Sequence, residues 1–219
     1  MLPNYDLAAT KAMELLISNK ITETPILSLP ILKNYPHVRI MSFANMADDY
    51  EINRDDLVLK FGSNQDAATF RMYGMEDVDY VVVYNMKLNH EDIRRAIARE
   101  LGHIVLGHDG QTRSTEVRMA EALCFAHHLL TPRPIVHMIQ QSDIPFTMNV
   151  LVHTTGCSKD CIDEIQSIPG TNVSKELNRK VRDLFAPHIL EYIRFHKSAP
   201  KKDTSAIIDF GSYMDNYKE

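Results

Sequence analysis

The sequence is poor in three features: cysteine, long apolar runs and an excess of positive charge. Its 219 residues include three cysteines, which are too few for a disulfide framework and agree with a reducing compartment. No stretch approaches the roughly 20 apolar residues of a membrane helix, so we expect no membrane partner. The net charge of -5 at pH 7 gives no general attraction to nucleic acid, and we expect no direct nucleic-acid partner.

The remaining composition predicts a globular protein. Apolar residues make up 44% of the chain, which is enough for a substantial core in one domain, or in a compact core with a helical extension. The sequence begins MLPNYDLAATKAMELL, where no basic segment precedes a long apolar run. We therefore expect a cytoplasmic protein.

The order of periodic segments predicts an α+β fold. Alternating or β-branched runs indicate three strands, at residues 37–43, 69–74 and 79–85, of which the last, DYVVVYN, is the strongest. Helical spacing of apolar residues indicates helices at 5–18, 89–107, 115–130, 135–141, 158–166 and 174–196. Because only helices follow the strands, we expect a small sheet that packs on the helices of the site.

Three parts are expected along the chain. Residues 1–134 form the domain with the sheet and the site helices, and residues 135–197 form a helical extension of the same globule. Residues 198–219 form a tail, in which charged residues surround an apolar cluster of Ile207, Ile208, Phe210, Tyr213 and Met214. This tail is either disordered or docks on the body or on a partner.

The stretch RELGH, residues 99–103, has the frame of a zinc-peptidase helix with one change. In such a helix two histidines four residues apart bind one metal ion, and the glutamate after the first histidine is the general base. Glu100 stands at the position of the base and His103 at that of the second ligand, but Arg99 replaces the first ligand. Gly102 would let the helix backbone approach a neighbouring element.

Arg99 opposes a standard zinc site. A guanidinium about 5 Å from a dication repels it by roughly 6 to 7 kcal/mol at an effective dielectric constant of about 20. Arginine cannot deprotonate to become a ligand, but its planar fork pairs with carboxylates. We therefore hypothesise that Arg99 takes the place of the metal's charge, bridges to Glu100 or to Glu121 of the helix expected at 115–130, and holds these two helices together.

The stretch RRAIARELGHIVLGHDG, followed by EALCFAHHLLTPRP, resembles the ImmA/IrrE family of metallopeptidases, which occurs in prophages and mobile elements. Its members carry HELGHxxLGH and then a glutamate in a helix of the form EAnxFAxxLLxP. The resemblance implies a minimal zincin-like fold, with His103 as the second zinc ligand, Glu100 as the catalytic base and Glu121 as the glutamate ligand. The departures are Arg99 and Leu123, which stands where the family has Asn or Asp.

A rearranged metal site is the alternative. About 100° of rotation per residue places Cys124 and His128 on the same face of their helix as Glu121, and together with His103 they offer ligands that suit zinc. His108 is a poorer substitute, because five residues turn it about 140° from His103 on a continuous helix, although fraying at Gly107 would bring it back. For Cys157 and Cys161, in CSKDC, we expect a structural role.

Two functions follow from these alternatives. In the first, a catalytically impaired zincin-like protein of prophage or mobile-element origin needs no cofactor and binds a regulatory protein or peptide. In the second, an active zinc metallopeptidase cleaves a repressor-type protein, as the best understood members of the family do. In both, an extended peptide would add to a sheet edge, expected at Val81, Val82, Val83 and Tyr84. A DNA-binding module after Pro134 would lack a basic recognition helix.

Overall fold

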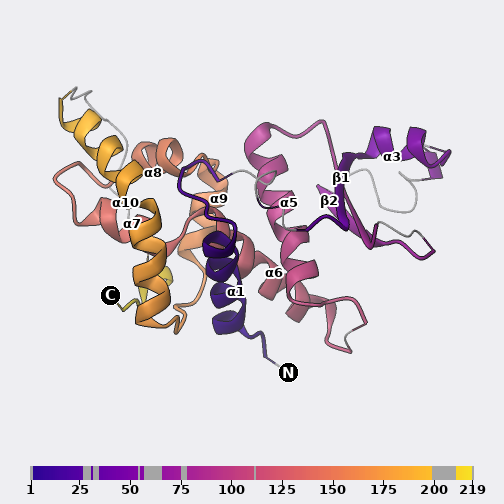
Figure 1. The fold of residues 1–219 in the computed structure, drawn as a ribbon, viewed down its shortest axis with the longest axis horizontal. Coiled ribbons are helices and arrows are strands. Elements are labelled where there is room, and N and C mark those ends of the chain that lie inside the picture. Colours follow the sequence, from indigo (N-terminus) through magenta and orange to yellow (C-terminus); the bar gives the residue numbers. More distant parts are fainter. Residues whose placement is uncertain are drawn as a thin grey trace.

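The computed structural model describes residues 2–26, 31, 35–53, 55–56, 66–74, 78–110, 112–198 and 211–218. A first helix precedes a three-stranded sheet, and further helices follow the sheet (Figure 1). Within these ranges no helix is long and apolar enough to cross a membrane. The elements are α1 (Tyr5–Ser18), β1 (Val38–Ser42), α3 (Phe43–Asp49), β2 (Ala67–Arg71), β3 (Tyr80–Tyr84), α5 (His90–Val105), α6 (Thr115–Leu130), α7 (Arg133–Gln140), α8 (Met148–Thr155), α9 (Lys159–Gln166), α10 (Lys175–Ser198) and the 3-10 helix η1 (Gly211–Met214).

The sheet has the strand order β1-β3-β2. β1 pairs with β3 in parallel, and β2 pairs with β3 in antiparallel orientation. Val81, Val82 and Val83 of β3 are fully buried, as expected for a strand covered on both faces and paired at both edges. The prediction that residues 81 to 84 offer a free peptide-binding edge is therefore wrong, because β3 is the central strand.

The two site helices cross closely. Asn89 caps α5 by accepting a hydrogen bond from the backbone N–H of Asp92, and α5 packs along α6 next to β2 and β3. At the crossing, a Cβ atom on Gly102 would lie 3.0 Å from Cδ1 of Phe125 and 3.1 Å from the carbonyl oxygen of Ala122. The close approach predicted for Gly102 is thus to α6.

We expect the substitution Gly102→Ala to destabilise the protein by about 1 to 3 kcal/mol, because the new methyl group must push the two helices apart. The better helix propensity of alanine, worth about 1 kcal/mol, opposes this loss. Urea unfolding of the variant would measure the difference. The control is Gly110→Ala, where a Cβ atom meets nothing within 4 Å and the cost comes from the positive φ alone. A Gly102→Ala variant as stable as the original chain would contradict this packing.

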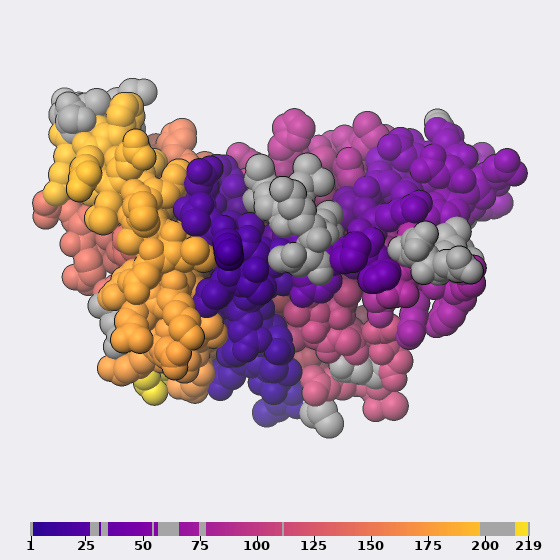
Figure 2. Space-filling model, in the orientation of Figure 1, coloured from indigo at the N-terminus to yellow at the C-terminus, as the bar shows by residue number. Residues whose placement is uncertain are grey.

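The helical half of the molecule is built around α1. This helix packs against α6 on one side and α10 on the other, and Figures 1 and 2 show it between the sheet-bearing half and α10. Its N-cap, Asn4, accepts a hydrogen bond from the backbone N–H of Leu7. A segment that precedes the sheet in the sequence therefore contacts the second site helix.

The end of the chain docks on the body. Tyr213 is fully buried, and its hydroxyl donates a hydrogen bond to the carbonyl oxygen of Thr131 at 2.8 Å. The buried Arg133 donates to the carbonyl oxygens of Met214 and Asp215. Of the two alternatives for the tail, docking is what residues 211–218 show. Ile207, Ile208 and Phe210 lie outside the described residues.

Candidate functional site

A cleft of about 590 Å³ lies between β2 and α5. Its lining joins the edge strand, the helix that carries RELGH, the turn after that helix and the start of α6. The residues that line it are Asp66, Ala67, Ala68, Thr69, Arg71, Tyr80, Arg99, Glu100, His103, Ile104, His108, Asp109, Arg118 and Met119. Three of the residues predicted from the motif, Arg99, Glu100 and His103, thus meet in one cavity.

Glu100 is buried and both of its carboxylate oxygens have partners. The hydroxyl of Thr69 donates to Oε2 at 2.8 Å, and the Nε and Nη2 atoms of Arg99 each donate to Oε1 at 3.3 Å. A buried carboxylate needs such partners to remain charged. In this arrangement the predicted base accepts three hydrogen bonds, and neither of its oxygens is without a partner.

Arg99 forms an ion pair with Glu100, one of the two carboxylates that the sequence suggested as its partner. Its guanidinium contacts Glu100 on its own helix and lies 4.0 Å from the carboxylate of Asp66, while its side chain is 19% exposed. It does not bridge to Glu121, so the hypothesis that Arg99 holds the two helices together is wrong. The part of the hypothesis that concerns Glu100 agrees with the observed contact.

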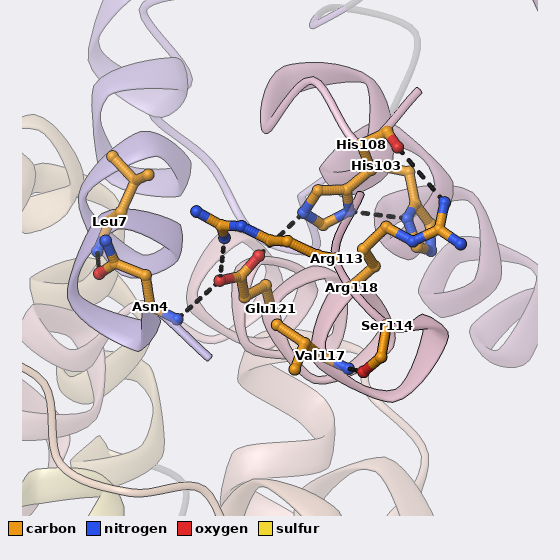
Figure 3. Close-up of polar contacts among 9 residues, drawn as sticks. All are labelled: Asn4, Leu7, His103, His108, Arg113, Ser114, Val117, Arg118 and Glu121. Carbon is orange, nitrogen blue, oxygen red and sulfur yellow. Dashed lines mark hydrogen bonds and ion pairs between the residues drawn. The ribbon is translucent and has the colours of Figure 1, made fainter. Parts of the chain in front are cut away.

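Glu121 is held by a different arginine. Arg113, in the loop between α5 and α6, donates to its Oε1 at 2.6 Å, and the backbone N–H of Asn4 donates to the same oxygen at 2.7 Å. The other oxygen lies 3.1 Å from Nε2 of His108. Figure 3 shows the carboxylate between these three groups. Since Glu121 is only 2% exposed, its charge is balanced within the protein.

His108 reaches the site because α5 ends before it. The helix ends at Val105, and Gly107 takes the left-handed conformation with φ 63°, which glycine adopts without strain. The chain then turns back, so that Nδ1 of His108 lies 2.8 Å from Nδ1 of His103. The helical rotation makes His108 a poorer expected ligand than the residues of α6, but the turn at Gly107 makes it the residue that links His103 to Glu121.

The hydrogen bonds assign the tautomers of both histidines. A carboxylate only accepts, so Nε2 of His108 carries the hydrogen that Glu121 receives. Burial lowers the pKa of His108, and burial, the neighbouring ring of His108 and the positive charges of Arg99 and Arg118 lower the pKa of His103 to about 4. Both rings are therefore neutral at pH 7. His108 then accepts at Nδ1 from the Nδ1–H of His103, and this leaves Nε2 of His103 without a hydrogen.

The residues present do not fit a zinc ion in this arrangement. Both oxygens of Glu121 already have partners, in Arg113, Asn4 and His108, and Arg99 brings a positive charge to the position of the first ligand. A search of the described ranges finds no group of three His, Cys, Asp or Glu residues arranged to hold a metal ion. A bare Nε2 on His103 is nevertheless the form in which histidine binds metals, so one ligand of a latent site is in place.

The ligands proposed for a rearranged metal site do not lie close together. The thiol of Cys124 contacts the carbonyl oxygen of Tyr5 at 3.7 Å, and burial raises its pKa to about 12. The ring of His128 lies 3.3 Å from the hydroxyl of Tyr213. Although His128 shares a face with Glu121, seven residues separate them, or about 10.5 Å along the helix axis. A shared helix face suggested that Glu121 and His128 bind one metal ion, but their separation along the helix axis is too large for that.

The two remaining cysteines lie in the core. Cys157 and Cys161 are 2% and 1% exposed. Cys157 lies 3.5 Å from the hydroxyl of Thr131, and Cys161 lies 3.8 Å from Nδ1 of His127. These contacts agree with the structural role expected for CSKDC.

The fold and the site together define a class of protein. A small mixed sheet with RELGH on the helix beside its edge strand, and a glutamate on the next helix, is a zinc-peptidase-like α+β protein. The model of the family Peptidase_M78, described as the IrrE N-terminal-like domain, matches residues 37–160. This is more than half of the chain, and the chain belongs to this family, as the resemblance to ImmA/IrrE proteins predicts. Searches of curated proteins and of solved structures find no match.

Proposed function

We propose that this protein binds an extended segment of a regulatory protein in the cleft beside β2 and does not cleave it. The observation that carries the proposal is that both site glutamates are held in ion pairs: Arg99 pairs with Glu100, at the position of the base, and Arg113 pairs with Glu121, at the position of the glutamate ligand. Both pairs lie where a zinc peptidase of this family would need free carboxylates. The cleft remains, and its open edge is suited to a peptide.

The open edge of β2 follows from the register. The N–H of Asn85 donates to the carbonyl oxygen of Asp66, and the N–H of Met72 donates to the carbonyl oxygen of Asp79. Asp66 and Met72, at the two ends of β2, therefore direct their backbone polar groups toward β3. Because this direction alternates in an antiparallel pair, Ala67, Thr69 and Arg71 point theirs away from β3. In the part of the chain that the structure describes, no strand pairs with this side of β2.

These unpaired groups are what an added strand requires. A peptide that pairs with Ala67, Thr69 and Arg71 obtains main-chain hydrogen bonds from the edge, while alternate side chains enter the neighbouring cleft. The peptide edge is thus proposed on β2, one strand away from the edge expected from the sequence. An intact protein partner of the repressor type, with an exposed extended segment, suits such an edge.

The second candidate is a zinc metallopeptidase that cleaves the same kind of partner. It is supported by the position of Glu100 in the cleft and by the bare Nε2 of His103 beside it. This candidate requires that Arg99 and Arg113 leave their carboxylates when metal and substrate bind. The two candidates differ in what happens to a bound peptide.

The test uses a library of synthetic decapeptides incubated with the purified protein, with and without added zinc. We expect peptides to be retained on the protein and recovered intact by mass spectrometry. We also expect Glu100→Gln to change their affinity less than threefold, because the side chain keeps its shape. Cleavage that appears with zinc and is abolished by Glu100→Gln would overturn the proposal in favour of the peptidase. Pro-substituted peptides, which cannot pair with an edge strand, serve as the control.

A further inference from the structure

The acidic residues of the cleft are all paired with cations. Asp109 accepts from Nη1 of Arg71 and from the hydroxyl of Tyr80, each at 2.8 Å. Glu100 and Asp66 share Arg99. The cleft therefore offers a ligand little free negative charge, although three carboxylates line it.

Arg118 differs from the other cations of the cleft. Among the residues that the structure describes, it has no carboxylate partner. Its Nη1 donates to the carbonyl oxygen of His108 and its Nη2 to the hydroxyl of Thr115, both at 3.3 Å, at the long end of the range for hydrogen bonds. Its Nε is buried and has no partner. A guanidinium has five N–H donors, so one N–H on each of the two Nη atoms remains for a ligand.

The position of Arg118 in its helix also favours an anion beside it. It is the fourth residue of α6, where the partial positive charge of the helix N-terminus disfavours a cation. Arg118 and Arg99 line the same cleft as His103, so both charges face the space around that ring. Two arginines therefore lie around His103, and among the described residues Arg118 pairs with no carboxylate.

We propose that Arg118 is a specificity-determining residue, which binds a carboxylate of the peptide that lies along β2. The inference rests on the proposed function and adds the class of ligand to it. Peptide side chains that face the same way as Thr69 and Arg71 point toward α5 and α6, where Arg118 lines the cleft. The carboxylate belongs either to an Asp or Glu side chain or to the C-terminus of the peptide.

The experiment measures the binding of fluorescein-labelled decapeptides by fluorescence anisotropy. One set has an amidated C-terminus and carries Glu, Gln or Lys at each position in turn, and a second set has Gln at these positions and a free C-terminus. The proteins compared are the original chain, Arg118→Gln, Arg118→Glu and a control, Arg179→Glu. Arg179 is exposed on α10, so the control makes the same change of charge away from the cleft.

We expect the original chain to prefer a carboxylate at one position, or at the C-terminus, over the neutral peptide by roughly tenfold. Arg118→Gln should remove this preference, Arg118→Glu should replace it with a preference for Lys, and Arg179→Glu should retain it. Which set carries the preference identifies the source of the carboxylate. Peptides that bind with no preference for a carboxylate, or with one that Arg118→Glu leaves unchanged, would overturn this inference and leave the proposed function standing. If no peptide of either set binds, both are overturned.

Discussion

The substitution Arg133→Ala is expected to destabilise the protein by about 3 kcal/mol or more, because it leaves several buried acceptors without a donor. Arg133 is fully buried. Its Nη1 donates to the carbonyl oxygen and the hydroxyl of Thr171 at 2.6 and 2.8 Å, and its Nη2 donates to the carbonyl oxygens of Met214 and Asp215 at 3.1 and 2.5 Å. One side chain therefore joins the start of α7 to two segments distant in the sequence.

The same substitution should release the docked end of the chain. Without Arg133, residues 211–218 retain the burial of Tyr213 and the bond from Asn178 to the carbonyl oxygen of Lys218, but they lose both contacts to the guanidinium. Urea unfolding would measure the stability, and limited proteolysis followed by mass spectrometry would measure cleavage near the C-terminus. Faster cleavage there is expected even under conditions in which the body of the protein stays folded.

Two variants make this prediction specific. Arg133→Lys keeps a positive charge but lacks the planar fork, so we expect a loss of stability between that of Arg133→Ala and the original chain. Arg194→Ala removes an exposed arginine of α10 and should change stability by less than about 0.5 kcal/mol. An Arg133→Ala variant with the stability and the proteolysis pattern of the original chain would refute the role of Arg133 as the anchor of the tail.

The strands and most helices could be predicted because their signals are local. The strands expected at 37–43 and 79–85 contain β1 and β3, and the strand expected at 69–74 overlaps the second half of β2. The order of the strands in space depends on a crossover connection, which local patterns do not encode. One signal for the central strand was available: an uninterrupted apolar run such as YVVVY is typical of a strand buried on both faces.

The site residues on the two helices could be predicted from the motif, but the residues that reach the site from loops and turns could not. Glu100, His103 and Glu121 lie at the cavity or next to it, because their helices have fixed periodicity. Arg113 and Asn4, which both donate to Oε1 of Glu121, come from a loop and from a segment 117 residues away in sequence, and no spacing rule connects them to Glu121. His108 depended on where the helix ends, and the glycine at 107 was the signal that it ends early.

The substitution Arg99→His is expected to create a zinc site in a chain that otherwise binds little zinc. It removes the guanidinium, whose repulsion of a dication is roughly 6 to 7 kcal/mol at about 5 Å and an effective dielectric constant of about 20, and it places an imidazole four residues before His103. Glu121 still pairs with Arg113 at 2.6 Å, so Arg99→His combined with Arg113→Gln should bind zinc more tightly than Arg99→His alone. Elemental mass spectrometry after dialysis against zinc would measure the metal content of each variant.

The control for this prediction is Arg95→His, which makes the same chemical change one turn earlier on α5. Arg95 pairs with Glu164 and not with a residue of the cleft, so its replacement should leave the zinc content unchanged. Adding His103→Ala to Arg99→His should remove the zinc again, because His103 supplies the bare Nε2. Nearly one zinc ion per molecule in the original chain would show instead that Arg99 and Arg113 give way to the metal, and the peptidase would become the better assignment. Zinc that appears only with Arg99→His would mean that two arginines keep a peptidase site in a form suited to binding.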